Sequence, residues 1–263
     1  VSILEQEFNL DINEEEITAE TTVEQLEVII KERKIFLEKD IFRNWVLWDI
    51  MTFIRAGYNL LLVDNVMRIF CRRTLAGQEN LKNIKEPVIF IANHVGYFDT
   101  PNILMSLPLQ IRNKVAVATW REYFEAPKHQ VFKRLLNVLF YQYATIFVNS
   151  YLFPKKRGFK KGFEYTGELL DKKWNILIFP EGEHSVSGEL QPFRSGIGWL
   201  VKEMKVPIVP IKHSGLEKIM AGDAYQIPRF GKVTIQIGKP LKLDYTKSIP
   251  EITNELQTVI EEM

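Results

Sequence analysis

Two short segments of the sequence hold residues that can do acid–base chemistry. In "IANHVGYFDT", residues 91–100, His94 and Asp99 lie five positions apart. A neutral imidazole can take a proton near pH 7, and a carboxylate bonded to its other nitrogen fixes the tautomer and stabilises the imidazolium that forms. The pair predicts a general base oriented by a carboxylate. Taken alone the spacing is weak, because an aspartate that caps a helix beside a hydrogen-bonded loop histidine explains it equally well.

The pair has no obvious protein nucleophile. A Gly-x-Ser-x-Gly sequence, which marks the nucleophile of many serine hydrolases, does not occur in the chain. The simplest completion is a substrate hydroxyl that attacks an acyl donor already activated as a thioester. The four histidines show no spacing typical of metal ligands, so we predict no metal site.

The second segment, "ILIFPEGEHSVSGELQPFRSGIGWL", spans residues 176–200. Glu181 follows an apolar run, and Gly182 permits close approach of the backbone to a ligand. Arg194 and Gly196 lie where a helix opens, a place suited to anion contact. Taken alone, this segment also fits an ordinary acidic turn.

These segments must be positioned by an alternation of strands and helices. Apolar, β-branched runs predict strands at 88–92, 115–119, 144–148, 176–179, 207–211 and 233–238. Helical patterns lie at 101–107, 128–141, 156–173 and 194–204, with a last helix from about Ile249. The alternation predicts an α/β fold with a mostly parallel central sheet flanked by helices. His94 and Glu181 would then follow strands, at the edge where ligands bind in such sheets.

Residues 41–75 are predicted to form a pair of amphipathic helices, bent near Gly57. Charged residues recur too often there for a membrane-spanning helix. Helices that pack on the core and helices that dip into a membrane surface remain open. The membrane interpretation rests on Trp45, Trp48, Phe53, Leu60, Leu61, Leu62 and Phe70. The uncharged stretch 135–154 reads as a helix followed by a buried strand.

Composition and the chain's start bound the function further. The 263 residues carry a net charge of +1, which gives no basic field for nucleic acid, and the lone Cys71 fits a reducing compartment. Residue 1 is Val and no signal peptide is visible. In residues 1–35, Thr21 and Glu24 predict a capping box before a short amphipathic helix. This segment is too short to bury much core alone.

In combination, the motifs resemble those of the glycerolipid acyltransferase family. "NHVGYFD", then "FPEG", "FRSG" and "VPIVPI", carry the resemblance over about residues 40–245. It implies an enzyme that acylates glycerol phosphate or lysophospholipids, with His94 as general base and Asp99 as its orienting partner. It also implies that Glu181 and Gly182 bind the acceptor, that 206–210, with Pro207, lines the acyl site, and that Arg121 and Glu122 are secondary candidates.

Two positions depart from the family's pattern. Ser150 and His184 stand where the resemblance leads us to expect arginines that hold the acceptor's phosphate. Residues 155–157, two lysines and an arginine, either replace them or form a solvated charge run. We therefore expect an acceptor other than lysophosphatidic acid.

The first 35 residues are similar to the second half of an acyl carrier domain. The serine that bears the phosphopantetheine arm in such domains would precede residue 1. The resemblance divides the chain into a partial carrier-like segment, 1–35, and an acyltransferase domain, 36–263. It implies acyl carrier protein or a carrier domain as partner, with acyl-phosphopantetheine or acyl-coenzyme A as co-substrate and no other cofactor.

The sequence thus predicts an O-acyltransferase that moves a fatty acyl group from a thioester to a hydroxyl of a lysophospholipid. We expect a peripheral or monotopic protein at the cytoplasmic face of a membrane. Two other functions remain open: a thioesterase or ester hydrolase in which His94 activates water, and a non-catalytic lipid-binding module of the same fold.

Overall fold

The structure, a computed structural model, describes residues 21–25, 27, 44–120, 131–153, 159–185, 187–220 and 227–263. Most of the carrier-like segment lies outside these ranges, and so do Arg121, Glu122 and residues 155–157. Within the described residues, no helix combines the length and the apolar character needed to cross a bilayer.

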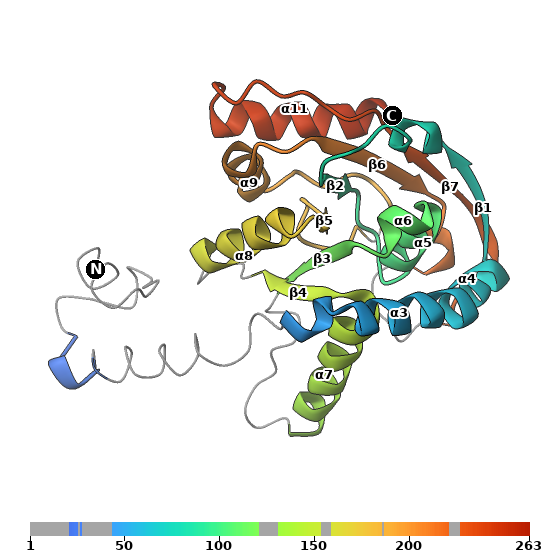
Figure 1. Cartoon of the computed structure of the whole chain (residues 1–263), viewed down its shortest axis with the longest axis horizontal. Coiled ribbons are helices and arrows are strands. Elements are labelled where there is room, and N and C mark those ends of the chain that lie inside the picture. Colours follow the sequence, from blue (N-terminus) through green and yellow to red (C-terminus); the bar gives the residue numbers. More distant parts are fainter. Residues whose placement is uncertain are drawn as a thin grey trace.

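The described residues form a seven-stranded sheet (Figure 1). Its strands are β1 (Cys71–Ala76), β2 (Ile89–Ala92), β3 (Val115–Trp120), β4 (Ser150–Phe153), β5 (Asn175–Ile178), β6 (Ile208–Ser214) and β7 (Gly231–Ile237). The spatial order is β1-β7-β6-β2-β5-β3-β4, and only the β6–β7 pairing is antiparallel. The predicted α/β fold with a mostly parallel sheet is confirmed.

Helices cover both faces of this sheet (Figure 1). One face packs against α8 (Phe159–Asp171), α9 (Gly196–Met204) and α11 (Ile249–Glu262). The other packs against η4 (Gln78–Leu81), α5 (Asp99–Ser106), α6 (Leu109–Arg112) and α10 (Leu216–Ile219). Alternate residues of β2 enter the two cores, Ile89 and Ile91 on one side and Phe90 and Ala92 on the other. Because both faces are buried, the central strands read as continuous apolar runs.

The N-terminal helices form one run rather than a pair bent at Gly57. After the short turn η2 (Asn44–Leu47), α3 (Asp49–Tyr58) continues through the π-helical turn η3 (Asn59–Val63) into α4 (Asp64–Phe70). The irregularity is therefore two residues beyond Gly57. Asn59 is buried and lines a cavity described below, so the widened turn faces the interior.

Two further segments differ from the sequence-based prediction. Cys71 to Ala76, expected to end the second helix, is the edge strand β1, paired with β7 about 160 residues away. Residues 144–148, expected to be a strand, are the π-helical turn η6 (Ala144–Val148) at the end of α7 (Val131–Tyr143). The buried Arg55 donates from Nε to the Ile146 carbonyl (3.0 Å), so contact with α3 overrides the strand propensity of these β-branched residues.

The start of the first described helix is also shifted by one residue. Thr22 N–H donates to Gln25 Oε1 (2.9 Å), and Gln25 N–H donates back to Thr22 Oγ1 (3.3 Å). These two bonds make a capping box with Thr22 as the cap.

Candidate active site

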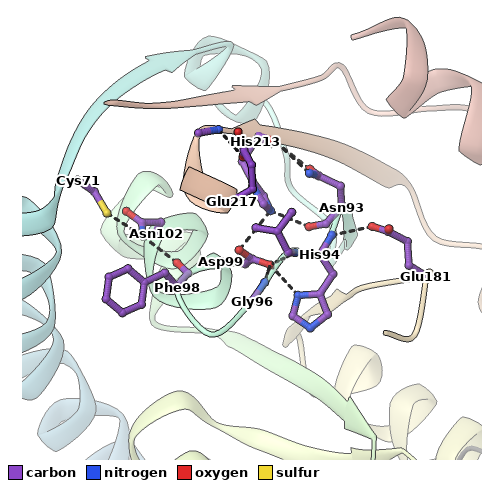
Figure 2. A network of polar contacts seen from close by, with 12 residues as sticks. Cys71, Asn93, His94, Gly96, Phe98, Asp99, Asn102, Glu181, His213 and Glu217 are labelled. Carbon is purple, nitrogen blue, oxygen red and sulfur yellow. Dashed lines mark hydrogen bonds and ion pairs between the residues drawn. The ribbon is translucent and has the colours of Figure 1, made fainter. Parts of the chain in front are cut away.

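His94 and Asp99 meet at the carboxyl end of β2, as the sequence predicted (Figure 2). His94 follows the strand, and Asp99 begins α5 after the turn at Gly96. His94 Nδ1 lies 2.7 Å from Asp99 Oδ2, which also accepts the main-chain N–H groups of Val95 (2.6 Å) and Gly96 (2.9 Å). The carboxylate thus folds back on the loop before its own helix, and it fixes both the ring of His94 and the backbone that carries it.

The pair's proton positions follow from these contacts. Burial of Asp99 opposes its ionisation, but electrostatic interactions with His213 and His94 and the hydrogen bonds from His94 and Gly96 outweigh it and hold its pKa below the usual value. Because an ionised carboxylate can only accept, Nδ1 of His94 carries the proton. In the neutral ring the lone pair is then on Nε2, for which no protein partner is found among the described residues.

Aromatic rings hold the imidazole of His94 on two sides. Phe179 stacks on it with ring centres 4.0 Å apart, and His184 meets it edge-on at 4.2 Å. Only 17% of the His94 side chain is exposed. A ring packed in this way has little freedom to turn, so Nε2 keeps its orientation without substrate.

His94 lines a cavity of about 410 Å³. Its wall is mostly apolar and comes from the N-terminal helices, α5, β3 and the end of α7 with η6. Representative lining residues are Leu62, Val66, Met67, Leu104, Met105, Val117, Phe140, Phe147 and Val148. The volume is in the range of small-molecule sites. The arrangement brings the imidazole of His94 to the wall of an apolar cavity.

Glu181, which follows β5, is buried and holds backbone instead of facing the cavity. Its Oε1 accepts the main-chain N–H of His94 (2.6 Å), and its Oε2 accepts that of Gln191 (2.7 Å). Burial raises the pKa of this carboxyl to about 6, although both of these hydrogen bonds lower it. Glu181 is not among the lining residues. Glu181 therefore does not reach the cavity where the predicted acceptor would bind. Both of its carboxylate oxygens instead accept backbone N–H groups, one of them that of His94.

Gly182 does line the cavity, and its conformation requires glycine. Its φ is +74°, and a Cβ there would come within 2.6 Å of Arg194 Nε. Arg194 crosses this glycine to donate from Nε to the Glu181 carbonyl (3.2 Å) and from Nη2 to Glu183 (2.8 Å). Neither Arg194 nor Gly196, the first residue of α9, is a lining residue.

A family model described as "Acyltransferase" matches residues 72–214, just over half of the chain. The chain belongs to the acyltransferase family. The matched region contains both residues of the His94–Asp99 pair, together with Glu181 and Gly182.

Named relatives of this acyltransferase agree with the family. A chloroplastic 1-acyl-sn-glycerol-3-phosphate acyltransferase of Brassica napus is 26% identical over 172 residues, which are 65% of this chain and 46% of that protein. A protein named taffazin from Dictyostelium discoideum is 30% identical over 173 residues, 61% and 57% of the two chains. The chain spans about half the length of these relatives.

The fold is also that of a solved acyltransferase. The crystal structure of the 1-acyl-sn-glycerophosphate acyltransferase PlsC from Thermotoga maritima matches with a TM-score of 0.57 and 18% identity. The match covers 80% of this chain and 77% of that one.

The remaining predicted site residues of the acyltransferase divide into two groups. Ser150, at the start of β4, and His184 both line the cavity. Pro207 does not: its carbonyl accepts the N–H of Ile89 (3.1 Å), at the amino end of β2. Because β2 and β6 are parallel, Pro207 lies at the opposite end of the sheet from His94, and we correct its expected place in the acyl site.

Sequence reasoning missed two buried residues of the acyltransferase site, Asn93 and His213 (Figure 2). They are joined by hydrogen bonds across the adjacent strands β2 and β6. The available signal was a polar pair at the ends of two apolar strands, but His213 follows Asn93 by 120 residues. Only the sheet order shows that they are neighbours.

Proposed function

We propose that this acyltransferase moves a fatty acyl group from a thioester to a hydroxyl of a lysophospholipid or related glycerolipid, with His94 as general base. The observation that carries the proposal is the open Nε2 of His94 at the wall of an apolar cavity, with Nδ1 held by Asp99. The family and the names of the relatives support the reaction class.

The proposed step needs no enzyme nucleophile. His94 Nε2 takes the proton from the acceptor hydroxyl as its oxygen bonds to the thioester carbonyl carbon. Asp99 stabilises the imidazolium during this step. The carbon–sulfur bond then breaks, and the imidazolium returns the proton to the departing thiolate.

The cavity suits a lipid chain because apolar walls stabilise hydrocarbon removed from water. Exposed apolar side chains gather on the two helices next to it, which touch through the hydroxyls of Tyr58 and Tyr143 (3.0 Å). They are Ile50, Phe53, Ile54, Leu60, Leu61, Leu62 and Ile69 on the α3–α4 run, and Leu135, Leu136, Val138, Leu139 and Phe140 on α7. These faces support the proposed contact with a membrane surface, from which the acceptor would enter.

Of the residues on which the sequence based this contact, Trp48, Phe53 and the leucines 60–62 are exposed. Trp45 and Phe70 are half-buried, and Phe70 stacks on Phe230 with ring centres 5.3 Å apart. The exposed apolar face of α7 lies outside the residues on which the sequence based this contact.

The acyl donor is either an acyl carrier or acyl-coenzyme A. The resemblance of residues 1–35 to half a carrier domain favours a carrier, which would raise the effective concentration of the thioester near His94.

One experiment tests the reaction and the donor together. The protein is incubated with vesicles that contain lysophospholipids and with a labelled acyl thioester, supplied either on a separate holo-carrier or on coenzyme A of the same chain length. Mass spectrometry identifies the product. We expect labelled diacyl lipid, formed faster with the carrier.

Other outcomes decide against parts of the proposal. Labelled free fatty acid as sole product, formed equally fast without lysolipid, would identify a hydrolase. Retention of lipid with both donors left intact would identify a binding module. A preference for coenzyme A that survives deletion of residues 1–35 would contradict the carrier donor but leave the transfer reaction standing.

A further inference from the structure

His213, on β6, is bound to Asn93 by both its backbone and its ring. Its main-chain N–H donates to Asn93 Oδ1 (2.9 Å), and its carbonyl accepts from Asn93 Nδ2 (3.0 Å). Its ring Nε2 lies 2.7 Å from the Asn93 carbonyl oxygen. A carbonyl can only accept, so Nε2 carries a proton. His213 therefore fixes the residue that immediately precedes the base His94.

The same ring nitrogen faces the other partner of His94. Asp99 places one carboxylate oxygen, Oδ2, in hydrogen bonds with the His94 ring and the loop backbone. Its second oxygen, Oδ1, is buried without a hydrogen-bond partner among the described residues, and His213 Nε2 lies 3.7 Å from it. Both side chains are fully buried, so water does not weaken this polar contact.

We propose that His213 is a positioning residue of the His94–Asp99 pair, acting through the Asn93 backbone and the second carboxylate oxygen of Asp99. The inference rests on the proposed function for its kinetic consequence only. The N–H of His213 partly stabilises an oxygen that otherwise has no donor, and it keeps the carboxylate turned so that Oδ2 meets His94 (Figure 2). Without it, this buried anionic oxygen would lose the polar contact with the His213 N–H, and an uncompensated buried charge is costly.

The geometry suggests which variants separate this role from packing. His213→Leu removes the ring N–H and keeps an apolar side chain. His213→Gln keeps an N–H donor at the same number of bonds from Cα as Nε2. Asn175→Leu is the matched control. Asn175 is also buried and also joins neighbouring strands, but at their amino ends, away from His94. Its side chain accepts from Val88 N–H (3.0 Å) and donates to the Lys114 carbonyl (3.1 Å).

Two readouts test the proposal on the full chain. For acyl transfer, we expect His213→Leu to lower kcat by about tenfold or more with KM changed by less than about twofold. His213→Gln should recover most of this loss. Asn175→Leu should lower Tm and leave kcat of the folded protein unchanged. The second readout is the proton NMR signal of the His94 Nδ1–H, which reports the bond to Asp99 without turnover.

The NMR signal separates failure of this proposal from failure of the proposed function. We expect it to shift in His213→Leu, to return in His213→Gln and to stay unchanged in Asn175→Leu. If His213→Leu does not fold, His213→Asn replaces it, because its amide is one bond too short to reach the Asn93 carbonyl. An unchanged signal in whichever of His213→Leu and His213→Asn folds would overturn the proposal. So would a His213→Gln variant whose kcat and signal change as much as those of that variant. A shifted signal in a protein without transfer activity would confirm the contact and contradict only the reaction.

Discussion

The two carboxylate oxygens of Asp99 contact different groups, and this difference explains the geometry of the site. Oδ2 accepts hydrogen bonds from the His94 ring and from two backbone N–H groups, while Oδ1 faces His213. The ring is therefore oriented by the same group that shapes the loop. Glu181, beyond the end of β5, accepts the main-chain N–H of His94 itself and so adds a second carboxylate contact to this loop.

Replacing Asp99 with Asn tests the charge of this carboxylate separately from its shape. The amide oxygen of Asp99→Asn can still accept from the loop, but a neutral amide does not stabilise the imidazolium of His94. We expect kcat to fall by a factor on the order of 100 or more, with KM for the lysolipid little changed. Steady-state kinetics on vesicles measure this, and a loss below about tenfold would show that the carboxylate charge is not used.

Glu181 should make stability depend on pH in a recognisable direction. Its pKa is raised by burial from 4.5 to about 6 in the folded protein, so folding takes up a proton in this range. The stability that depends on Glu181 is fully present below pH 4.5 and is lost as pH rises through about 6. The free energy of unfolding of wild type minus that of Glu181→Gln should fall by about 1 kcal/mol across this window, after allowance for solvent screening. Urea denaturation at several pH values measures it, and a difference that rises with pH would contradict the prediction.

The residues that line the cavity near His94 should determine which acceptor head group the enzyme prefers. Ser150 and His184 line the cavity where the resemblance leads us to expect phosphate-binding arginines, and serine cannot replace a bidentate charged contact. We expect kcat/KM for lysophosphatidic acid to be no higher than for lysophosphatidylethanolamine or lysophosphatidylglycerol. His184→Arg should shift the ratio toward lysophosphatidic acid. A preference of wild type for lysophosphatidic acid by about tenfold would contradict this, and it is the preference that the names of the relatives favour.

Among individual residues, the sequence predicts contacts between side chains that are close along the chain. His94 and Asp99 could be paired because one short turn joins them. The bonds from Glu181 to the His94 backbone and from His213 to Asn93 depend on strands that are neighbours in space but 87 and 120 residues apart in sequence. A single sequence carries no signal for such contacts.

Among the elements, buried strands were easier to predict than exposed or irregular ones. All four residues of β2 are apolar, and so are the last three of β5, because both faces of these strands are covered. The edge strand β1 is mostly exposed and carries Arg72 and Arg73, so its sequence looks like the end of a charged helix. The η6 turn has the β-branched residues of a strand, and the Arg55 contact that keeps it helical comes from another element.

The exposed faces of the α3–α4 run and of α7 predict membrane binding through both elements. A double variant, Leu61→Asp with Leu139→Asp, places charges on two side chains that are 75% and 57% exposed. Because each apolar side chain contributes about 1.5–3 kcal/mol when fully buried, vesicle binding should fall by at least about tenfold. Flotation with zwitterionic and anionic vesicles measures this.

The control for this experiment is Trp199→Asp on α9. Trp199 is 52% exposed and is not a lining residue of the cavity, and α9 packs on the face of the sheet opposite to α5 (Figure 1). Its replacement should leave flotation unchanged. Equal losses in both variants, or wild type that stays in solution with every vesicle, would assign the exposed helices another role.

In the whole molecule, the sheet order brings segments that are distant in sequence together at the carboxyl ends of the central strands. β6, β2 and β5 are neighbours, so His213, Asn93 with His94, and Glu181 converge there, and the N-terminal helices and α7 close an apolar cavity over them. The fold class was predictable because the alternation of strands and helices is regular. The strand order was not predictable, and it determines which polar residues meet.

The central claim is that His94 is the base for acyl transfer to a lipid hydroxyl. The most direct test compares wild type with His94→Ala in the vesicle assay, with labelled acyl thioester and lysophospholipid, after circular dichroism has shown that both are folded. We predict that His94→Ala loses transfer by a factor of about 100 or more, because the substitution removes the imidazole that Asp99 orients at the cavity wall. Turnover by His94→Ala above about a tenth of the wild-type rate would contradict the mechanism.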